Sequence, residues 1–181
     1  MKKSLYSIFA LMAMLIAFTS CEKDEVENTA TVEMAGEWHI HVSALDAETG
    51  EVADPDWFGD GNYNITTCNT ASNVANEMWL VDAVCYYFPY QVLIDVNPSN
   101  MTFNSSTDAE NLFGPGNYGG ETVTITNGKI VKNGTTTPSG MPADYIEYYV
   151  SFSGDPFPGA YGVKKEYFIS GFRYTGFTED E

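Results

Sequence analysis

Residues 36–42 read GEWHIHV, and this stretch decides the fold class of the chain. Trp38, Ile40 and Val42 alternate with other residues, and a period of two is typical of a strand with one buried face. The same alternation places His39 and His41 on the opposite face, which we expect to be exposed to solvent. The folded part of the chain is therefore expected to open with a half-buried β-strand.

Further strand-like runs follow, and no window shows the periodicity of a convincing amphipathic helix. The segments between the runs are rich in Gly, Pro, Asn and Asp, which are residues that dominate turns. We predict an all-β fold with one domain at residues 34–181, an antiparallel barrel or sandwich of about eight strands. The runs cover residues 62–68, 77–82, 89–96, 100–104, 121–126, 129–132, 145–152 and 163–174.

The pair Asn127-Gly128 separates two of these runs. Asn-Gly is the strongest short signal for a β-hairpin, because both central positions of a type I′ turn require φ > 0. We therefore expect a tight hairpin here, with Ile125 opposite Ile130 on one face of the sheet.

The N-terminus carries the parts of a bacterial lipoprotein signal in the correct order. Lys2 and Lys3 precede an uncharged apolar run at residues 8–17, which is shorter than the roughly 20 residues that span a bilayer. A small residue then stands directly before Cys21, and this arrangement resembles a lipobox. We therefore predict that residues 1–20 are a signal peptide and that the Cys21 thiol carries the lipid. Stable anchoring needs several acyl chains, and a triacylated cysteine would supply them.

Residues 21–33 are acidic and contain few large apolar side chains, so we interpret them as a flexible tether between the lipid and the domain. The stretch EKDE at residues 22–25 resembles the acidic export signal beside the lipidated cysteine of Bacteroidota lipoproteins. A generic acidic linker would have the same composition. The expected location is the outer membrane, lipid-anchored and at the cell surface.

The charge of the chain limits its partners. The whole chain has a formal charge of −17, and removal of residues 1–20 would take away Lys2 and Lys3 and bring it to −19. Such a surface repels nucleic acid and anionic headgroups, so we exclude nucleic acid and expect membrane contact only through the lipid. Hydrophobic residues make up 44% of the chain, which favours a packed core over a disordered acidic segment. The sequence assigns no protein partner.

Cys68 and Cys85 are the cysteines that remain after Cys21. They could form a disulfide in an exported protein, provided that their Cα atoms lie within about 7 Å. They could equally be buried free thiols, since free Cys is among the most buried residue types.

The sequence contains no recognisable catalytic motif. It lacks G-x-S-x-G, and any triad that requires a histidine would have to use His39 or His41. These two and Glu37 would suit zinc, but no motif places the further ligand that a zinc site needs. We therefore predict no metal, no cofactor and no catalytic residue, and hydrolysis of an unknown substrate stays an open alternative.

Several segments together resemble one known family. They include MAGEW at residues 34–38, TCNTA at 67–71, EMWLVD at 77–82, the run 92–103 and GFRYTGF at 171–177. This set is similar to a family of Bacteroidota lipoproteins described as lipid-binding putative hydrolases, which look lipocalin-like. The resemblance covers nearly all of residues 34–181 and implies a calycin-type barrel that binds a lipid-like ligand. It transfers no catalytic residue.

A broader likeness to lipocalin-like barrels concerns Trp38 and Arg173. Gly36-Glu37-Trp38 is a G-x-W at the start of the first strand, and Arg173 lies in the last strand. In such barrels the Trp closes one end and an Arg packs across it, because a guanidinium can stack on an indole and donate to carbonyls. The resemblance therefore implies a barrel-closing pair of Trp38 and Arg173.

The function that these observations favour is non-covalent binding of a small apolar or amphipathic ligand inside the barrel, entered from the end opposite Trp38. The alternative is a surface module for glycans or proteins, which would use aromatic residues in Gly-rich loops. A lining that surrounds a cavity favours lipid, whereas a coplanar outward platform favours sugar. The candidates for the interior are Trp79, Tyr148, Phe152, Tyr167 and Phe168, and those for the loops are Trp57, Phe58, Tyr118 and Tyr161.

The lysines decide the expected charge of the ligand. Lys129, Lys132, Lys164 and Lys165 are the lysines of the domain. Lys129 and Lys132 follow Asn127-Gly128 and should lie at one end of the barrel. If they ring the open mouth, an anionic lipid is expected, and if they lie at the sealed end, a neutral ligand is expected.

Overall fold

The computed structural model describes residues 28–58 and 63–180. The expected signal peptide, Cys21 and the first part of the tether lie outside these residues. No helix in the described part of the chain is long and apolar enough to cross a membrane.

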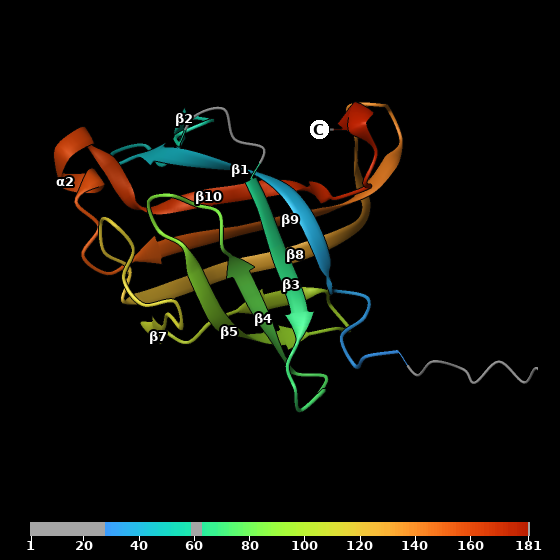
Figure 1. Cartoon of the computed structure of the whole chain (residues 1–181). Coiled ribbons are helices and arrows are strands. Elements are labelled where there is room, and N and C mark those ends of the chain that lie inside the picture. The colour runs from blue at the N-terminus through green and yellow to red at the C-terminus, as the bar shows by residue number, and fades with distance from the viewer. Residues whose placement is uncertain (1–27, 59–62, 181) are drawn as a thin grey trace, which may run out of the picture.

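The described residues are almost entirely β-structure (Figure 1). The short helix α2 lies in the connection between the long strands β9 and β10. The elements are β1 (Gly36–Asp46), β2 (Val52–Asp54), β3 (Tyr63–Asn69), β4 (Glu77–Asp82), β5 (Tyr90–Asn97), β6 (Thr102–Asn104), β7 (Ala109–Glu110), β8 (Thr122–Thr136), β9 (Pro142–Phe152), α2 (Phe157–Tyr161), β10 (Val163–Arg173) and the 3₁₀ turn η1 (Thr178–Asp180).

Eight of these strands form a closed antiparallel barrel, which confirms the predicted fold class. The chain passes up and down through β1, β3, β4, β5, β6, β8, β9 and β10, and β10 then pairs with β1. The closing register places Trp38 beside Arg173 and Val42 beside Ile169. The short strands β2 and β7 lie off this path, on β1 and β8. Closure leaves the barrel strands without an exposed edge that could pair with another chain.

The strands alternate as a half-buried barrel wall should. In β4 and β5 every second residue is buried, and the inward side chains of all strands meet in one core. The space that remains among Val42, Phe88, Tyr90 and Phe152 is only about 10 Å³, too small for an organic ligand. Large side chains fill this part of the interior, so the expected ligand cavity is not found among these residues.

The expected hairpin at Asn127-Gly128 is also wrong. Residues 122–136 form one continuous strand, and its register against β9 shifts between Thr126 and Lys129. Asn127 has φ 54°, so the pair supplies the positive φ of a β-bulge and not that of a turn. Ile125 and Ile130 consequently lie in the same strand, and both point into the core. An Asn-Gly pair satisfies either geometry, and the neighbouring strands decide between them.

The bulge also allows a close contact across the sheet. A Cβ atom on Gly128 would overlap the Phe103 ring and lie 2.6 Å from the Phe103 carbonyl oxygen. Phe103 is fully buried in the core, so it has no room to move away.

We predict that Gly128→Ala lowers the free energy of unfolding by about 2 kcal/mol, because overpacking a filled core costs roughly this amount. Urea unfolding would measure the loss. The matched control is Gly159→Ala in α2, where an added Cβ meets no atom within 4 Å. Equal stability of Gly128→Ala and the wild-type protein would show that the bulge does not require glycine.

Candidate ligand-binding site

The topology gives the barrel two different ends. The connections β1–β3, β4–β5, β6–β8 and β9–β10 all lie at one end, which we call the mouth. The first residues of β1 and the last of β10 lie at the other, which we call the closed end. The described N-terminal residues, in blue, and α2, in orange, lie at opposite ends of the barrel (Figure 1).

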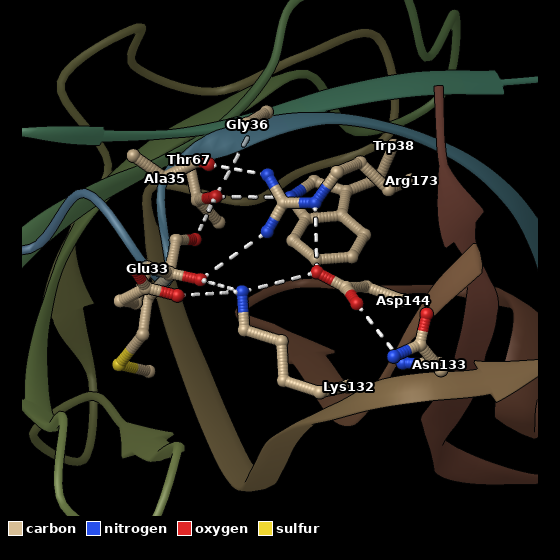
Figure 2. Close-up of polar contacts among 10 residues, drawn as sticks. Glu33, Ala35, Gly36, Trp38, Thr67, Lys132, Asn133, Asp144 and Arg173 are labelled. Atoms are coloured by element: carbon tan, nitrogen blue, oxygen red, sulfur yellow. Dashed lines mark hydrogen bonds and ion pairs between the residues drawn. The ribbon is translucent and has the colours of Figure 1, made fainter. Parts of the chain in front are cut away.

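At the closed end the Arg173 guanidinium lies over the Trp38 indole, with Cζ 4.4 Å from the ring centroid. The guanidinium also donates to the carbonyl oxygens of Ala35 and Glu33, and Nε donates to the Asp144 carboxylate at 3.1 Å (Figure 2). A planar, permanently charged fork can make all these bonds while it stacks on a ring. Arg173 therefore joins the first strand, the last strand and the segment before β1.

Two further residues keep Trp38 in this place. The indole Nε1–H donates to Thr67 Oγ1 at 2.9 Å, and the Thr67 hydroxyl donates to the Met34 carbonyl at 2.7 Å. A Cβ atom on Gly36 would overlap Arg173 Nη1. The glycine of G-x-W is thus explained by the space that the guanidinium occupies.

Asp144 completes the closed end as the shared partner of two cations. It accepts from Arg173, from Lys132 Nζ at 3.2 Å and from the Asn133 N–H at 3.0 Å (Figure 2). Burial opposes ionisation of this carboxyl, but the Asn133 N–H and the two cations together hold its pKa below the ordinary value. The carboxylate is therefore ionised wherever the protein is folded near neutral pH.

The end of the expected tether belongs to this folded structure. Thr31 is buried, and Lys132 pairs with the Glu33 carboxylate at 2.9 Å. Arg173 and Lys132 both bind backbone oxygen of Glu33. The cations of the closed end thus hold the segment directly before Met34 against the barrel.

At the mouth, aromatic side chains from separate connections surround a pocket of about 380 Å³. This volume is within the range of small-molecule sites. The side chains come from the β1–β3, β4–β5 and β6–β8 connections and from α2. They are Asp54, Trp57, Phe58, Tyr87, Tyr118, Phe157 and Tyr161, and we call the space that they line the mouth pocket.

Several rings of the mouth pocket meet at steep angles, while Phe58 and Tyr87 stack at 21°. Trp57 and Tyr161 lie 5.6 Å apart at 82°, and Tyr87 and Phe157 lie 5.6 Å apart at 77°. Tyr118 contacts Phe157 with centroids 5.2 Å apart. Such rings form the walls of a hollow and not a coplanar platform.

Polar residues below the rim fix the loops that carry these rings. Asp155 accepts from the Phe157 N–H at 2.9 Å and from the Tyr167 hydroxyl at 2.6 Å, which ties α2 to β10. The buried Asn111 amide donates to the carbonyls of Pro89 and Gly120. Neighbouring mouth loops are therefore joined by hydrogen bonds and do not depend on the ligand for their position.

The floor of the mouth pocket is a layer of aromatic rings over the filled core. Phe88 is fully buried and stacks on Phe152, with centroids 4.5 Å apart at 8°. Phe58 contacts both Phe88 and Tyr167. The mouth pocket is thus a surface hollow with an apolar floor.

Asp82 and Cys85 lie beside this floor, on the core side. Burial raises the pKa of Asp82 to about 6, although the N–H groups of Cys85 and Val84 donate to it. Burial, together with the charge of Asp82, raises the pKa of the Cys85 thiol to about 11. Cys85 is therefore a thiol at neutral pH, the form that is a poor nucleophile.

The structure divides the expected interior residues into three groups. Phe152 and Tyr167 lie in the floor region of the mouth pocket, and Tyr148 is deep in the core with its hydroxyl 2.6 Å from that of Tyr90. Trp79 and Phe168 alternate with buried residues and lie on the outer wall. Trp79 borders an outer groove with Leu93 and Leu112, so neither it nor Phe168 can line the interior.

Of the two histidines that were expected to face solvent, one does and the other is buried on the outer wall. His41 is exposed, but only 5% of His39 is, because its ring packs on Phe172 and Tyr174 on the outer wall. Cys68 and Cys85 are both free thiols. In residues 28–58 and 63–180, no three His, Cys, Asp or Glu side chains form a group that could hold a metal ion.

The residues named for the glycan alternative are the ones that meet in the mouth pocket. Trp57, Phe58, Tyr118 and Tyr161 all line it, although they lie on three separate connections. Sequence reasoning missed Tyr87 and Phe157. The signal that could have found Phe157 is its place in the Gly- and Pro-rich loop that also holds Tyr161.

These features define a small up-and-down β-barrel that is closed at one end and has an aromatic pocket at the other. A family model described as "lipid-binding putative hydrolase" matches residues 23–178, and the chain belongs to this family. A comparison with curated proteins gives no match. The family and the barrel both fit a lipid-binding function.

We predict that Asp82→Asn stabilises the protein at pH 7.5 by about 3 kcal/mol, since burial shifts the pKa of Asp82 from 3.8 to about 6 and so disfavours its ionised form. A carboxyl with a raised pKa in the folded state makes the folded protein less stable as pH rises from its unfolded pKa, about 4, to its folded pKa, about 6. The gain should therefore disappear near pH 4, and urea unfolding across this range would measure it. Asp95→Asn, at an exposed carboxyl, is the control. If Asp82→Asn were less stable than the wild-type protein at pH 7.5, the raised pKa of Asp82 would be contradicted.

Proposed function

We propose that this protein is an exported lipoprotein, anchored through Cys21, that captures a lipid-like ligand non-covalently in the mouth pocket. The single observation that carries this proposal is the pocket of about 380 Å³ with aromatic walls, at the end of the barrel away from Trp38. Membership of the lipid-binding family supports the class of ligand.

The shape of the mouth pocket favours an apolar group over a sugar. Sugars stack on flat, outward aromatic faces, whereas Trp57 and Tyr161 meet at 82° and form two walls of a hollow. A hollow of this kind removes an apolar group from water on several sides, which is the main source of affinity for such groups. The tyrosines among the lining residues have hydroxyls that can make polar contacts with an amphipathic ligand.

The closed end and the mouth have different roles in this proposal. Strand β1 has 11 residues, so it is roughly 35 Å long at about 3.3 Å per residue, and its tilt brings the two ends of the barrel somewhat closer than that. The seven peptide links from Cys21 to Asn28 can span at most about 25 Å. We infer that the closed end lies nearer the anchoring membrane and that the mouth opens away from it. The acidic stretch at residues 22–25 supports display on the cell surface.

Hydrolysis is the second candidate, and only the family description favours it. Its possible nucleophile and base lie on different sides of the barrel wall, because Cys85 borders the core while His39 and His41 are on the outside. The raised pKa of Cys85 also keeps it protonated. Binding is therefore the function that the geometry supports best.

We predict that Trp57→Ala weakens binding of the neutral dye N-phenyl-1-naphthylamine about tenfold or more, because it removes one wall of the mouth pocket. Trp79→Ala is the matched control, since Trp79 lies in the outer groove. Fluorescence titration with the purified protein would measure both. Loss of binding in Trp79→Ala and not in Trp57→Ala would move the site to the outer wall and contradict the proposal.

We also predict that Cys21→Ala shifts the protein from the membrane fraction to the soluble fraction of the cell, because the attachment site for the lipid is removed. Immunoblots of the separated fractions would show the shift. Ser20→Ala keeps a small residue before Cys21 and should stay membrane-bound. Retention of Cys21→Ala in the membrane would argue against lipid anchoring at this residue.

A further inference from the structure

The mouth pocket contains one acidic side chain and no basic one among its lining residues. Asp54 lies at the rim, and its Oδ1 accepts a hydrogen bond from the Asp56 N–H at 2.9 Å. This bond fixes the carboxylate at the edge of an otherwise aromatic hollow. A negative charge in such a place favours a positive group in the ligand.

The cations in the described part of the chain form no ion pair with Asp54, although Lys164 and Lys165 lie at the start of β10, at the mouth end of the barrel. Arg173 and Lys132 pair with Asp144 at the closed end, Lys129 pairs with Glu147 at 2.8 Å, and Lys164 lies 3.7 Å from Glu166. Lys165 is exposed and borders a hollow with Ser151, Lys164 and Glu166. Within residues 28–58 and 63–180, no ion pair neutralises Asp54.

The aromatic walls of the mouth pocket also favour a positive charge on the ligand. The face of an aromatic ring is negative, and a cation within about 6 Å of a ring centroid is attracted to it. Trp57, Tyr161, Tyr87 and Phe157 present rings at steep mutual angles around one space, so a compact cation could contact more than one ring at once. This is the geometry by which proteins bind quaternary ammonium groups.

An anionic ligand does not fit these observations. Asp54 and the ring faces would both repel it, and the formal charge of the chain is −17. A neutral group would gain from burial alone, and Asp54 would lose hydration without gaining a partner. An organic cation would gain from burial of its apolar groups, from contact with the ring faces and from the charge of the Asp54 carboxylate.

We propose that the mouth pocket selects an ammonium group, quaternary or alkylated, which contacts the rings of Trp57 and Tyr161 and is balanced by Asp54. This inference rests on the proposed function and specifies the chemistry of the ligand. The ammonium group could belong to a lipid headgroup, such as choline, or to a free small amine.

The test compares choline with its uncharged carbon isostere, 3,3-dimethyl-1-butanol. Each competes with N-phenyl-1-naphthylamine for the purified Cys21→Ala protein. We expect choline to displace the dye at a concentration about tenfold lower than its isostere does, because only choline gains the cation–π and carboxylate contacts. Asp54→Asn should lose most of this preference, and Asp95→Asn, which removes the same charge from the outer wall, should keep it.

The outcomes separate this inference from the proposed function. If the dye binds but choline and its isostere compete equally, or if Asp54→Asn keeps the full preference, the ammonium assignment is overturned and apolar binding stands. If the dye does not bind at the mouth pocket, the proposed function itself fails. Sedimentation with phosphatidylcholine vesicles separates the two sources. If the protein sediments with the vesicles and free choline blocks this, the ligand is a lipid headgroup. If the protein prefers choline over its isostere but does not bind the vesicles, the ligand is a free amine.

Discussion

The stacking of Arg173 on Trp38 is the interaction on which the rest of this structure depends. It occurs where the first and last strands of the barrel pair, so it links the two ends of the chain across the closing seam. The guanidinium also binds carbonyl oxygens of the segment before β1, and Asp144 balances its charge. A cation–π contact of this kind contributes about 2 kcal/mol when it is shielded from water. The arrangement admits only glycine at position 36 without displacing the guanidinium.

Closure of one end determines where a ligand can bind. The closed end is occupied by Trp38, Arg173 and Asp144, and the interior is filled by large side chains such as Tyr148 and Phe103. At the mouth, the described residues leave a pocket of about 380 Å³, where loops from different strand pairs bring their aromatic residues together. The barrel is therefore a rigid support for a surface site, and its packed core gives the stability that allows aromatic loops to stay exposed. Hydrogen bonds accepted by Asp155 and donated by Asn111 hold those loops in place without a ligand.

Sequence reasoning reached the fold because the strand signal is local. The alternation at Trp38, Ile40 and Val42 depends only on the period of a strand, and the closing strand shows a similar pattern. It failed at Asn127-Gly128 because a turn and a bulge both require positive φ, and only the partner strand β9 distinguishes them. The site was harder to predict. Trp57, Tyr118 and Tyr161 are far apart in sequence, and what brings them together is the order of the strands, which no local pattern contains. Trp79 was placed wrongly because one residue of register decides whether a side chain faces the core or the outer wall.

The chain has three tryptophans, and each reports on a different part of the account: Trp38 at the closed end, Trp57 in the mouth pocket and Trp79 on the outer wall. Their indole N–H signals in a ¹⁵N-correlated NMR spectrum therefore locate a bound ligand directly. During titration with N-phenyl-1-naphthylamine, the account predicts that the Trp57 signal shifts in proportion to occupancy while those of Trp38 and Trp79 stay in place. A shift of Trp38 or Trp79 with an unchanged Trp57 signal would contradict it, because the ligand would then bind at the closed end or on the outer wall.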